Sequence, residues 1–225
     1  MAQALEQLPA ERRRQLRSWQ PAPEAGLRNC DRGEQPLLDL ASNDYLGLAC
    51  HPALIEAASR CMASEGVGAG ASRLVSGNRP VHEQLEAALA QWLGRARVLL
   101  FPSGFQANLA AVQALADRRT LVLADRLIHH SLLVGVQASG ARLQRFAHNN
   151  LTDLQRRLEH ARRDAPQRRL LVISESLFSM EGTSPDLVAL SALCQRHNAA
   201  LLLDEAHALG VLGPGGRGLG HGVEG

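Results

Sequence analysis

The segment LLLDEAH, residues 201–207, ends an apolar run on two acids and a histidine. In helicase-type nucleotidases, such an acid holds magnesium beside a glycine-rich phosphate loop whose lysine reaches the transferred phosphates. This sequence has no such loop, and its basic residues are 24 arginines without one lysine. It also lacks the basic, aromatic-interleaved surface that binds single-stranded nucleic acid. We therefore exclude a nucleic-acid motor and expect no nucleic-acid partner.

A metal hydrolase is the next hypothesis for these residues, because His129, His130, Asp204 and His207 are all common metal ligands. Adjacent histidines on one element point in different directions, and no third ligand follows at a familiar spacing. The cysteines show no C-x-x-C pairing or zinc spacing and are expected to be free thiols: Cys30, Cys50, Cys61 and Cys194. We expect no metal centre.

The chain must position these side chains with alternating strands and helices. Apolar runs predict strands at 97–101, 120–125, 142–147, 169–176 and 199–206. Amphipathic stretches between them predict helices at 81–94, 149–164 and 184–198, with Gly94 as a C-cap and Asn150 and Ser184 as N-caps. This alternation is typical of an α/β fold with a mainly parallel sheet and helices on both faces.

Composition indicates an ordinary globular protein, with 45% hydrophobic residues, 20% charged residues and a net charge of +2. We expect an N-terminal arm at 1–40, containing a basic helix, followed by one large domain at 41–225. No apolar run approaches membrane-spanning length, and the first residues lack the apolar core of a secretion signal. We expect a cytoplasmic protein without a membrane partner.

Ligands of open α/β sheets bind beyond the carboxyl ends of the strands. Ser103, Gly104 and Phe105 follow one predicted strand and open a helix, whose N-terminal N–H groups suit a phosphate. His129, Ser179 and the pair Asp204 and His207 follow later strands. A phosphate site, an imidazole, a hydroxyl and a carboxylate at successive strand ends resemble the pyridoxal phosphate pocket of fold-type I enzymes, where a carboxylate keeps the pyridine nitrogen protonated.

The resemblance is more specific along the chain, from about residue 12 to the last residue. It rests on the segments LASNDYLGLACHP (40–52), GVGAGASRLVSGN (66–78), LLFPSGFQANLAAV (99–112), ADRLIHHSLLVG (124–135), QRFAHNNLTDL (144–154), ESLFSMEG (175–182) and LLLDEAHALGVLGPGGRG (201–218). Together these resemble the α-oxoamine synthase family. The resemblance implies a pyridoxal phosphate-dependent condensation of L-alanine with pimeloyl-CoA, or its acyl-carrier form, in biotin biosynthesis, with loss of CO2 and the thiol.

The resemblance also implies residue roles. Gly104 and Phe105 would lie at the cofactor phosphate, and His129 would stack on the ring and face the substrate. Ser179 and His207 would contact the region of the ring oxygen, and Asp204 the pyridine nitrogen. Arg17 matches an N-terminal arginine that the family uses toward the acyl substrate.

Two departures from the family follow. The residue after the stacking histidine is usually small, whereas here it is His130. The cofactor-linking lysine of the family lies beyond the GRG loop, and this chain stops before it. We expect an N-terminal part of a longer protein that is inactive alone, lacks a small C-terminal domain and leaves an unpaired sheet edge that lowers solubility.

Two other functions stay open. One is a family member that uses glycine, because it shares nearly all these motifs. The other is a lysine-less, non-catalytic subunit that pairs with an active partner. The family is homodimeric with sites at the subunit interface, and the loop 66–78 resembles one that contributes there.

Overall fold

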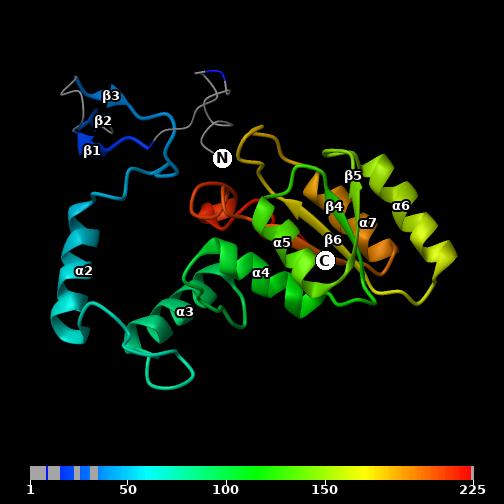
Figure 1. Cartoon of the computed structure of the whole chain (residues 1–225), viewed down its shortest axis with the longest axis horizontal. Helices are drawn as coiled ribbons and strands as arrows, with labels where there is room; N and C mark the ends of the chain where they lie inside the picture. The colour runs from blue at the N-terminus through cyan, green and yellow to red at the C-terminus, as the bar shows by residue number, and fades with distance from the viewer. Residues whose placement is uncertain (1–8, 10–15, 23–25, 31–34, 224–225) are drawn as a thin grey trace. The chain divides into compact units, whose positions relative to one another are not determined.

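The computed structural model describes residues 9, 16–22, 26–30 and 35–223. The chain divides into two compact units, Met1–Gly66 and Val67–Gly225, and Figure 1 labels most of their elements. Among the described residues, no helix combines the length and the apolar character needed to cross a bilayer. The expected division of the chain at residue 40 stays a prediction.

In its described residues, the first unit contains a small antiparallel sheet and one helix. Strands β1 (Trp19–Ala22), β2 (Gly26–Asn29) and β3 (Leu37–Leu38) pair in the order β1-β2-β3. Helix α2 (Pro52–Glu65) begins with a proline, and the His51 side chain caps its first turn by accepting from the Ala53 N–H. The expected basic helix of the arm falls mostly on residues 10–15, which lie outside the described residues.

The second unit is built on a parallel sheet of four strands. These are β4 (Leu121–Asp125), β5 (Arg142–Phe146), β6 (Leu170–Glu175) and β7 (Ala200–Asp204), in the spatial order β5-β4-β6-β7. The helices are α3 (Pro80–Leu93), α4 (Gly104–Leu115), α5 (His130–Ser139), α6 (Leu151–Asp164) and α7 (Leu187–Arg196), with a short 3-10 turn at Pro214–Gly216. The predicted α/β fold is confirmed.

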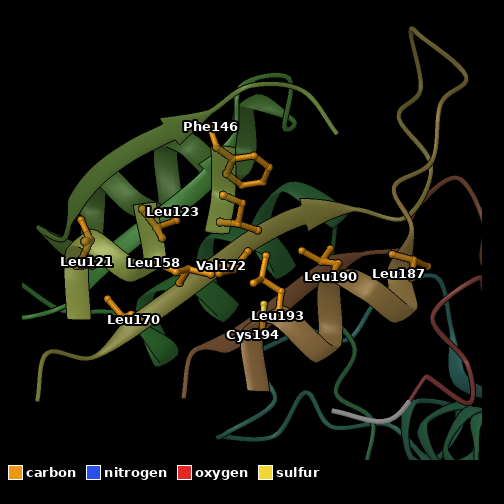
Figure 2. Packing of buried hydrophobic residues seen from close by; sticks show 12 residues of the cluster. Leu121, Leu123, Phe146, Leu158, Leu170, Val172, Leu187, Leu190, Leu193 and Cys194 are labelled. Atoms are coloured by element: carbon orange, nitrogen blue, oxygen red, sulfur yellow. The ribbon is translucent and has the colours of Figure 1, made fainter. Parts of the chain in front are cut away.

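Alternate residues of the strands pack against opposite helix layers, because successive side chains of a strand point to opposite faces. Leu121 and Leu123 of β4 belong to a core shared with α6 and α7, which Figure 2 shows from close by. Val122 and Ala124 belong to a second core shared with α4 and α5. Every residue of β4 and β6 is buried, as expected for strands covered on both faces.

The helix ends follow the sequence signals, with one correction. Gly94 ends α3 in the left-handed conformation, and the Asn150 side chain caps α6, as predicted. Helix α7 is capped by Asp186 and not by Ser184, so the predicted start was wrong. The Ser184 hydroxyl instead donates to the Ser176 carbonyl at 2.6 Å.

The predicted strand at 97–101 is also wrong, because these residues form no strand. A strand needs a neighbour for its backbone hydrogen bonds, and β7 has no second partner strand among the described residues. Leu99 is 67% exposed there. A cavity of about 370 Å³ lies beside β7 and α7, lined by side chains that include Leu187, Cys194, Leu201 and Leu203. The β7 side of the sheet is therefore open in the described chain.

Helices α4 and α5 approach each other closely at Gly135. A Cβ atom at Gly135 would lie 2.9 Å from Val112 Cβ and 3.4 Å from the Asn108 carbonyl oxygen. Cβ atoms do not tolerate such a short contact, so the helices could approach this closely only with glycine at this position.

We predict that Gly135→Ala destabilises the protein. Replacing glycine by alanine inside a helix normally stabilises it by about 0.5–1 kcal/mol, but overpacking costs about 1–3 kcal/mol. The free energy of unfolding in urea should therefore fall by about 1–2 kcal/mol. Gly104→Ala is the matched control, because no atom lies within 4 Å of the added Cβ. A stabilised Gly135→Ala protein would contradict the close packing of α4 and α5.

Candidate active site

Three parallel strands end in carboxylic acids at the same edge of the sheet. Asp125 ends β4, Glu175 ends β6 and Asp204 ends β7, and Glu175 is in register with Asp204. Asp125 and Glu175 are buried, and Asp204 is half-buried. Among the described residues, no group of three or more side chains is arranged to hold a metal ion. Each of the three acids accepts hydrogen bonds from the protein.

The two oxygens of Asp204 are fixed by different donors. Oδ2 accepts from the side-chain amide of Asn108 on α4 at 2.7 Å. Oδ1 accepts from the backbone N–H of Ala206 at 2.9 Å. Hydrogen bonds to a charged acceptor are among the strong ones, so the carboxylate is held in one orientation while part of it stays accessible.

His129 is linked to Asp204 through two side chains. Its Nδ1 lies 2.6 Å from Ser131 Oγ, and Ser131 Oγ accepts from the Asn108 amide at 3.0 Å. Ser131 is fully buried, whereas the His129 ring is exposed. The structure thus brings two of the predicted site residues, His129 and Asp204, into one hydrogen-bonded group.

Glu175 is hydrogen-bonded to the backbone of His129. Its Oε1 accepts from the backbone N–H of His129 at 2.5 Å. Burial raises the pKa of Glu175 to about 7, and the nearby Asp204 and Asp125 carboxyls add to the rise, while the His129 N–H opposes it. Near neutral pH, this carboxyl group therefore exists in both protonation states.

Asp125 is satisfied by a separate set of donors. The backbone N–H groups of Leu127 and Asn149 donate to its two oxygens, at 2.9 and 2.8 Å. His148 Nδ1 lies 3.0 Å from Oδ1, and its Nε2 lies 2.7 Å from the Thr183 hydroxyl. His148 therefore connects the end of β4 to the loop that follows β6, which carries Ser179.

The second acid of the DEAH segment holds the following loop. Glu205 accepts from the Leu219 and Gly220 backbone N–H groups and from the Ser176 hydroxyl, at 3.0, 2.6 and 2.8 Å. A Cβ at Gly220 would lie 2.6 Å from Glu205 Oε1. Asp204 therefore belongs to the candidate site, whereas Glu205 holds the following loop. The sequence DEAH alone does not distinguish these two roles.

The remaining predicted site residues are placed as follows. Gly104 and Phe105 are the first two residues of α4, both exposed, and the Ser103 side chain caps this helix by accepting from Gln106. His207 is half-buried in the turn after β7, and Ser179 is exposed in the loop after β6. Arg17 is exposed in the first unit. Seven site residues have roles that stay predictions: Arg17, Gly104, Phe105, His129, Ser179, Asp204 and His207.

Sequence reasoning missed Asn108, Ser131 and Glu175. Asn108 lies one turn after Gly104 in α4, and Ser131 lies two residues after His129, so both belong to segments that the motifs had singled out. A small polar residue near the start of an otherwise apolar helix is the sequence signal that could have identified both residues. Glu175 had no such signal, because its importance depends on strand register.

The model of one family, described as aminotransferase class I and II, matches residues 35–219. The chain belongs to this family.

Two curated relatives in this aminotransferase class I and II family are 8-amino-7-oxononanoate synthases. That of Chromohalobacter salexigens is 50% identical over 183 residues, covering 81% of this chain and 47% of the relative. That of Acidithiobacillus ferrooxidans is 47% identical over 207 residues, covering 91% and 52%. The chain thus spans about half the length of the curated relatives that it matches. The resemblance to α-oxoamine synthases is confirmed.

Two solved structures each match this chain over about half of their own length. A serine palmitoyltransferase from S. paucimobilis, with a bound PLP–myriocin aldimine, is 32% identical with a TM-score of 0.83, covering 89% of this chain and 49% of that one. An 8-amino-7-oxononanoate synthase from Francisella tularensis is 30% identical with a TM-score of 0.65, covering 80% and 48%.

We predict that Glu175→Gln changes how the stability of this aminotransferase-family chain depends on pH. Because the pKa of Glu175 is raised from 4.5 to about 7, the folded state binds its proton more tightly than the unfolded state. This contribution is complete below about pH 4.5 and is lost as the pH rises to about 7. The variant should therefore match the wild type at low pH and exceed it by up to about 3 kcal/mol above pH 7.

Urea unfolding at a series of pH values measures this difference. Glu159→Gln is the control, because this glutamate is exposed on α6 and water solvates its carboxylate. A Glu175→Gln protein whose advantage over the wild type is the same at pH 4.5 and pH 8 would show that Glu175 is not a buried titrating group.

Proposed function

We propose that these residues form the cofactor-binding part of an 8-amino-7-oxononanoate synthase, which condenses L-alanine with a pimeloyl thioester through pyridoxal phosphate. The observation that carries the proposal is the Asp204 carboxylate, fixed by Asn108 and Ala206 at the carboxyl end of β7. The names of the curated relatives support the synthase over other members of the family. The activity, substrates and partners proposed here are those of the whole protein.

The residues fit this cofactor. The N-terminus of α4 offers free N–H groups at Gly104 and Phe105, with open space in front of Gly104, and such helix ends favour a phosphate. The imidazole of His129 is exposed and can offer its face to a planar ring. Asn108 links the helix that would hold the phosphate to the acid that would face the ring nitrogen.

Asp204 would keep the pyridine nitrogen protonated, and when bound the ring then accepts electrons from a substrate carbanion. His129 would stack on the ring and limit its tilt. The predicted contacts of Ser179 and His207 with the ring oxygen region belong to this proposal, as does that of Arg17 with the acyl substrate.

The chain has no lysine, so the amine that links the cofactor covalently and moves the substrate proton must come from outside these residues. Arginine cannot replace it, because its guanidinium group stays protonated. We therefore propose that the 225 residues are inactive alone. Within this proposal, the whole protein is a cytoplasmic homodimer.

A second candidate is a non-catalytic subunit that completes the site of a lysine-bearing partner. The same absence of lysine favours it. Co-purification with a lysine-bearing homologue would distinguish it from the first proposal. A synthase that uses glycine has less support, because the curated relatives that we compare are 8-amino-7-oxononanoate synthases.

We predict that Asp204→Ala weakens pyridoxal phosphate binding by about tenfold or more, because it removes a charged partner of the ring nitrogen. Cofactor fluorescence titration of the chain and of the variant measures the two dissociation constants. Asp164→Ala is the control, because this acid is exposed at the end of α6. Equal affinities of the wild type and Asp204→Ala would remove the basis of the proposed site.

Activity tests the proposal in a chimera, in which these residues replace the matching part of the Chromohalobacter salexigens relative. We predict that the chimera forms 8-amino-7-oxononanoate from L-alanine and a pimeloyl thioester, because the relative supplies the lysine. The product is measured by mass spectrometry, with the 225-residue chain alone as the inactive control. A chimera that accepts glycine and rejects alanine would favour the other synthase.

A further inference from the structure

Asn108 donates both hydrogens of its side-chain amide within the site. Nδ2 lies 2.7 Å from Asp204 Oδ2 and 3.0 Å from Ser131 Oγ. The orientation of the amide follows from chemistry, since a carboxylate offers only acceptors and must face the nitrogen. One amide group therefore touches both β7 and the start of α5.

The hydrogen bonds beyond Asn108 have a definite direction. Since Ser131 Oγ accepts from Asn108, its own hydrogen is available for His129 Nδ1, 2.6 Å away. The Ser131 backbone N–H also points at this nitrogen, at 3.3 Å. With two donors directed at Nδ1, this atom is an acceptor, and the ring proton of the uncharged imidazole lies on Nε2.

The surroundings leave these groups little freedom. Ser131 is fully buried, so its hydroxyl has no water to replace either partner. The close packing of α4 against α5 at Gly135 keeps Asn108 and Ser131 within hydrogen-bonding distance. The direction of the hydrogen bonds is therefore built into the packing.

We propose that Asn108 is a positioning residue that couples Asp204 to His129. It holds the carboxylate with one hydrogen and, through Ser131, fixes the tautomer and orientation of the imidazole with the other. The coupling is a property of this chain, and its use on a cofactor ring rests on the proposed function. In that setting, one side chain would align the acid facing the ring nitrogen with the imidazole stacked on the ring.

Asn108→Asp reverses the direction of the hydrogen bonds. The aspartate oxygen that faces Ser131 accepts the Ser131 hydrogen, so Ser131 Oγ presents a lone pair to His129 and favours a proton on Nδ1, against the longer contact from the Ser131 backbone N–H. Histidine 15N–1H NMR spectra of the labelled chain at about pH 8 distinguish the tautomers. We expect the ratio of the Nε2–H to the Nδ1–H form of His129 to fall about tenfold or more. The His129→Gln spectrum assigns the signal.

Ser131→Ala is the matched control, because it removes the connecting hydroxyl and leaves the Asn108–Asp204 contact in place. In this background, Asn108→Asp should leave the His129 tautomer ratio unchanged. An equal change with and without Ser131 would mean that the new charge acts through space, and this result would overturn the proposal.

Asn108→Ala tests the same coupling without a new charge, should the aspartate variant fail to fold. Ser131 then loses its fixed donor, so the His129 tautomer ratio should move toward that of the urea-unfolded chain. A natively folded Asn108→Ala protein with the wild-type ratio would overturn the proposal.

Pyridoxal phosphate titration of the same proteins separates the two proposals. We expect Asn108→Ala to bind the cofactor about tenfold more weakly than the wild type. If the two proteins bind the cofactor with equal affinity, the positioning role of Asn108 is wrong and the proposed function still stands. If neither protein binds the cofactor, the proposed function fails, and the tautomer ratios still decide whether Asn108 couples the two residues.

Discussion

Three carboxylic acids at neighbouring strand ends are the constraint around which this end of the sheet is built. Parallel pairing of β4, β6 and β7 places Asp125, Glu175 and Asp204 at one edge, and burying a carboxylate is costly unless it is hydrogen-bonded or protonated. The chain uses a different solution for each. Asp125 receives backbone N–H groups and His148, burial raises the pKa of Glu175, and Asn108 and Ala206 donate to Asp204.

These solutions connect the helix layer to the strand ends. Asn108 reaches Asp204 from α4, and Ser131 reaches the same amide from α5. The contact between Asn108 and Ser131 requires the two helices to lie close together, which Gly135 permits. The packing of an apolar helix pair therefore determines how the polar groups at the edge of the sheet are arranged, although no charged residue takes part in that packing.

Patterns that depend on neighbours in sequence could be predicted well. The apolar runs of β4 and β6, the left-handed Gly94 and the Asn150 cap all follow from local chemistry. The predicted strand at 97–101 was wrong, because strand formation also depends on a partner strand that an apolar run does not reveal. The predicted N-cap at Ser184 was wrong, because the Ser184 hydroxyl donates to the Ser176 carbonyl, a contact made across a loop.

The candidate site could be predicted in part for the same reason. Asp204 ends β7 and His129 lies in the short connection after β4, and strand ends are where polar side chains gather. Asn108, Ser131 and Glu175 act through contacts between distant segments, such as the 2.5 Å bond from the His129 N–H to Glu175. Such contacts depend on register and helix packing, which a single sequence does not encode in a readable pattern.

The contact between Asn108 and Asp204 joins residues that are 96 positions apart, and this separation has a consequence for biosynthesis. On the ribosome, α4 and α5 can associate as soon as both have left the exit tunnel, because few residues separate them. The side-chain amide of Asn108 then lacks its Asp204 partner until β7 leaves the tunnel. A translational pause before residue 204 would hold the nascent chain in a state with a formed helix pair and an open sheet edge, which is a surface that chaperones recognise.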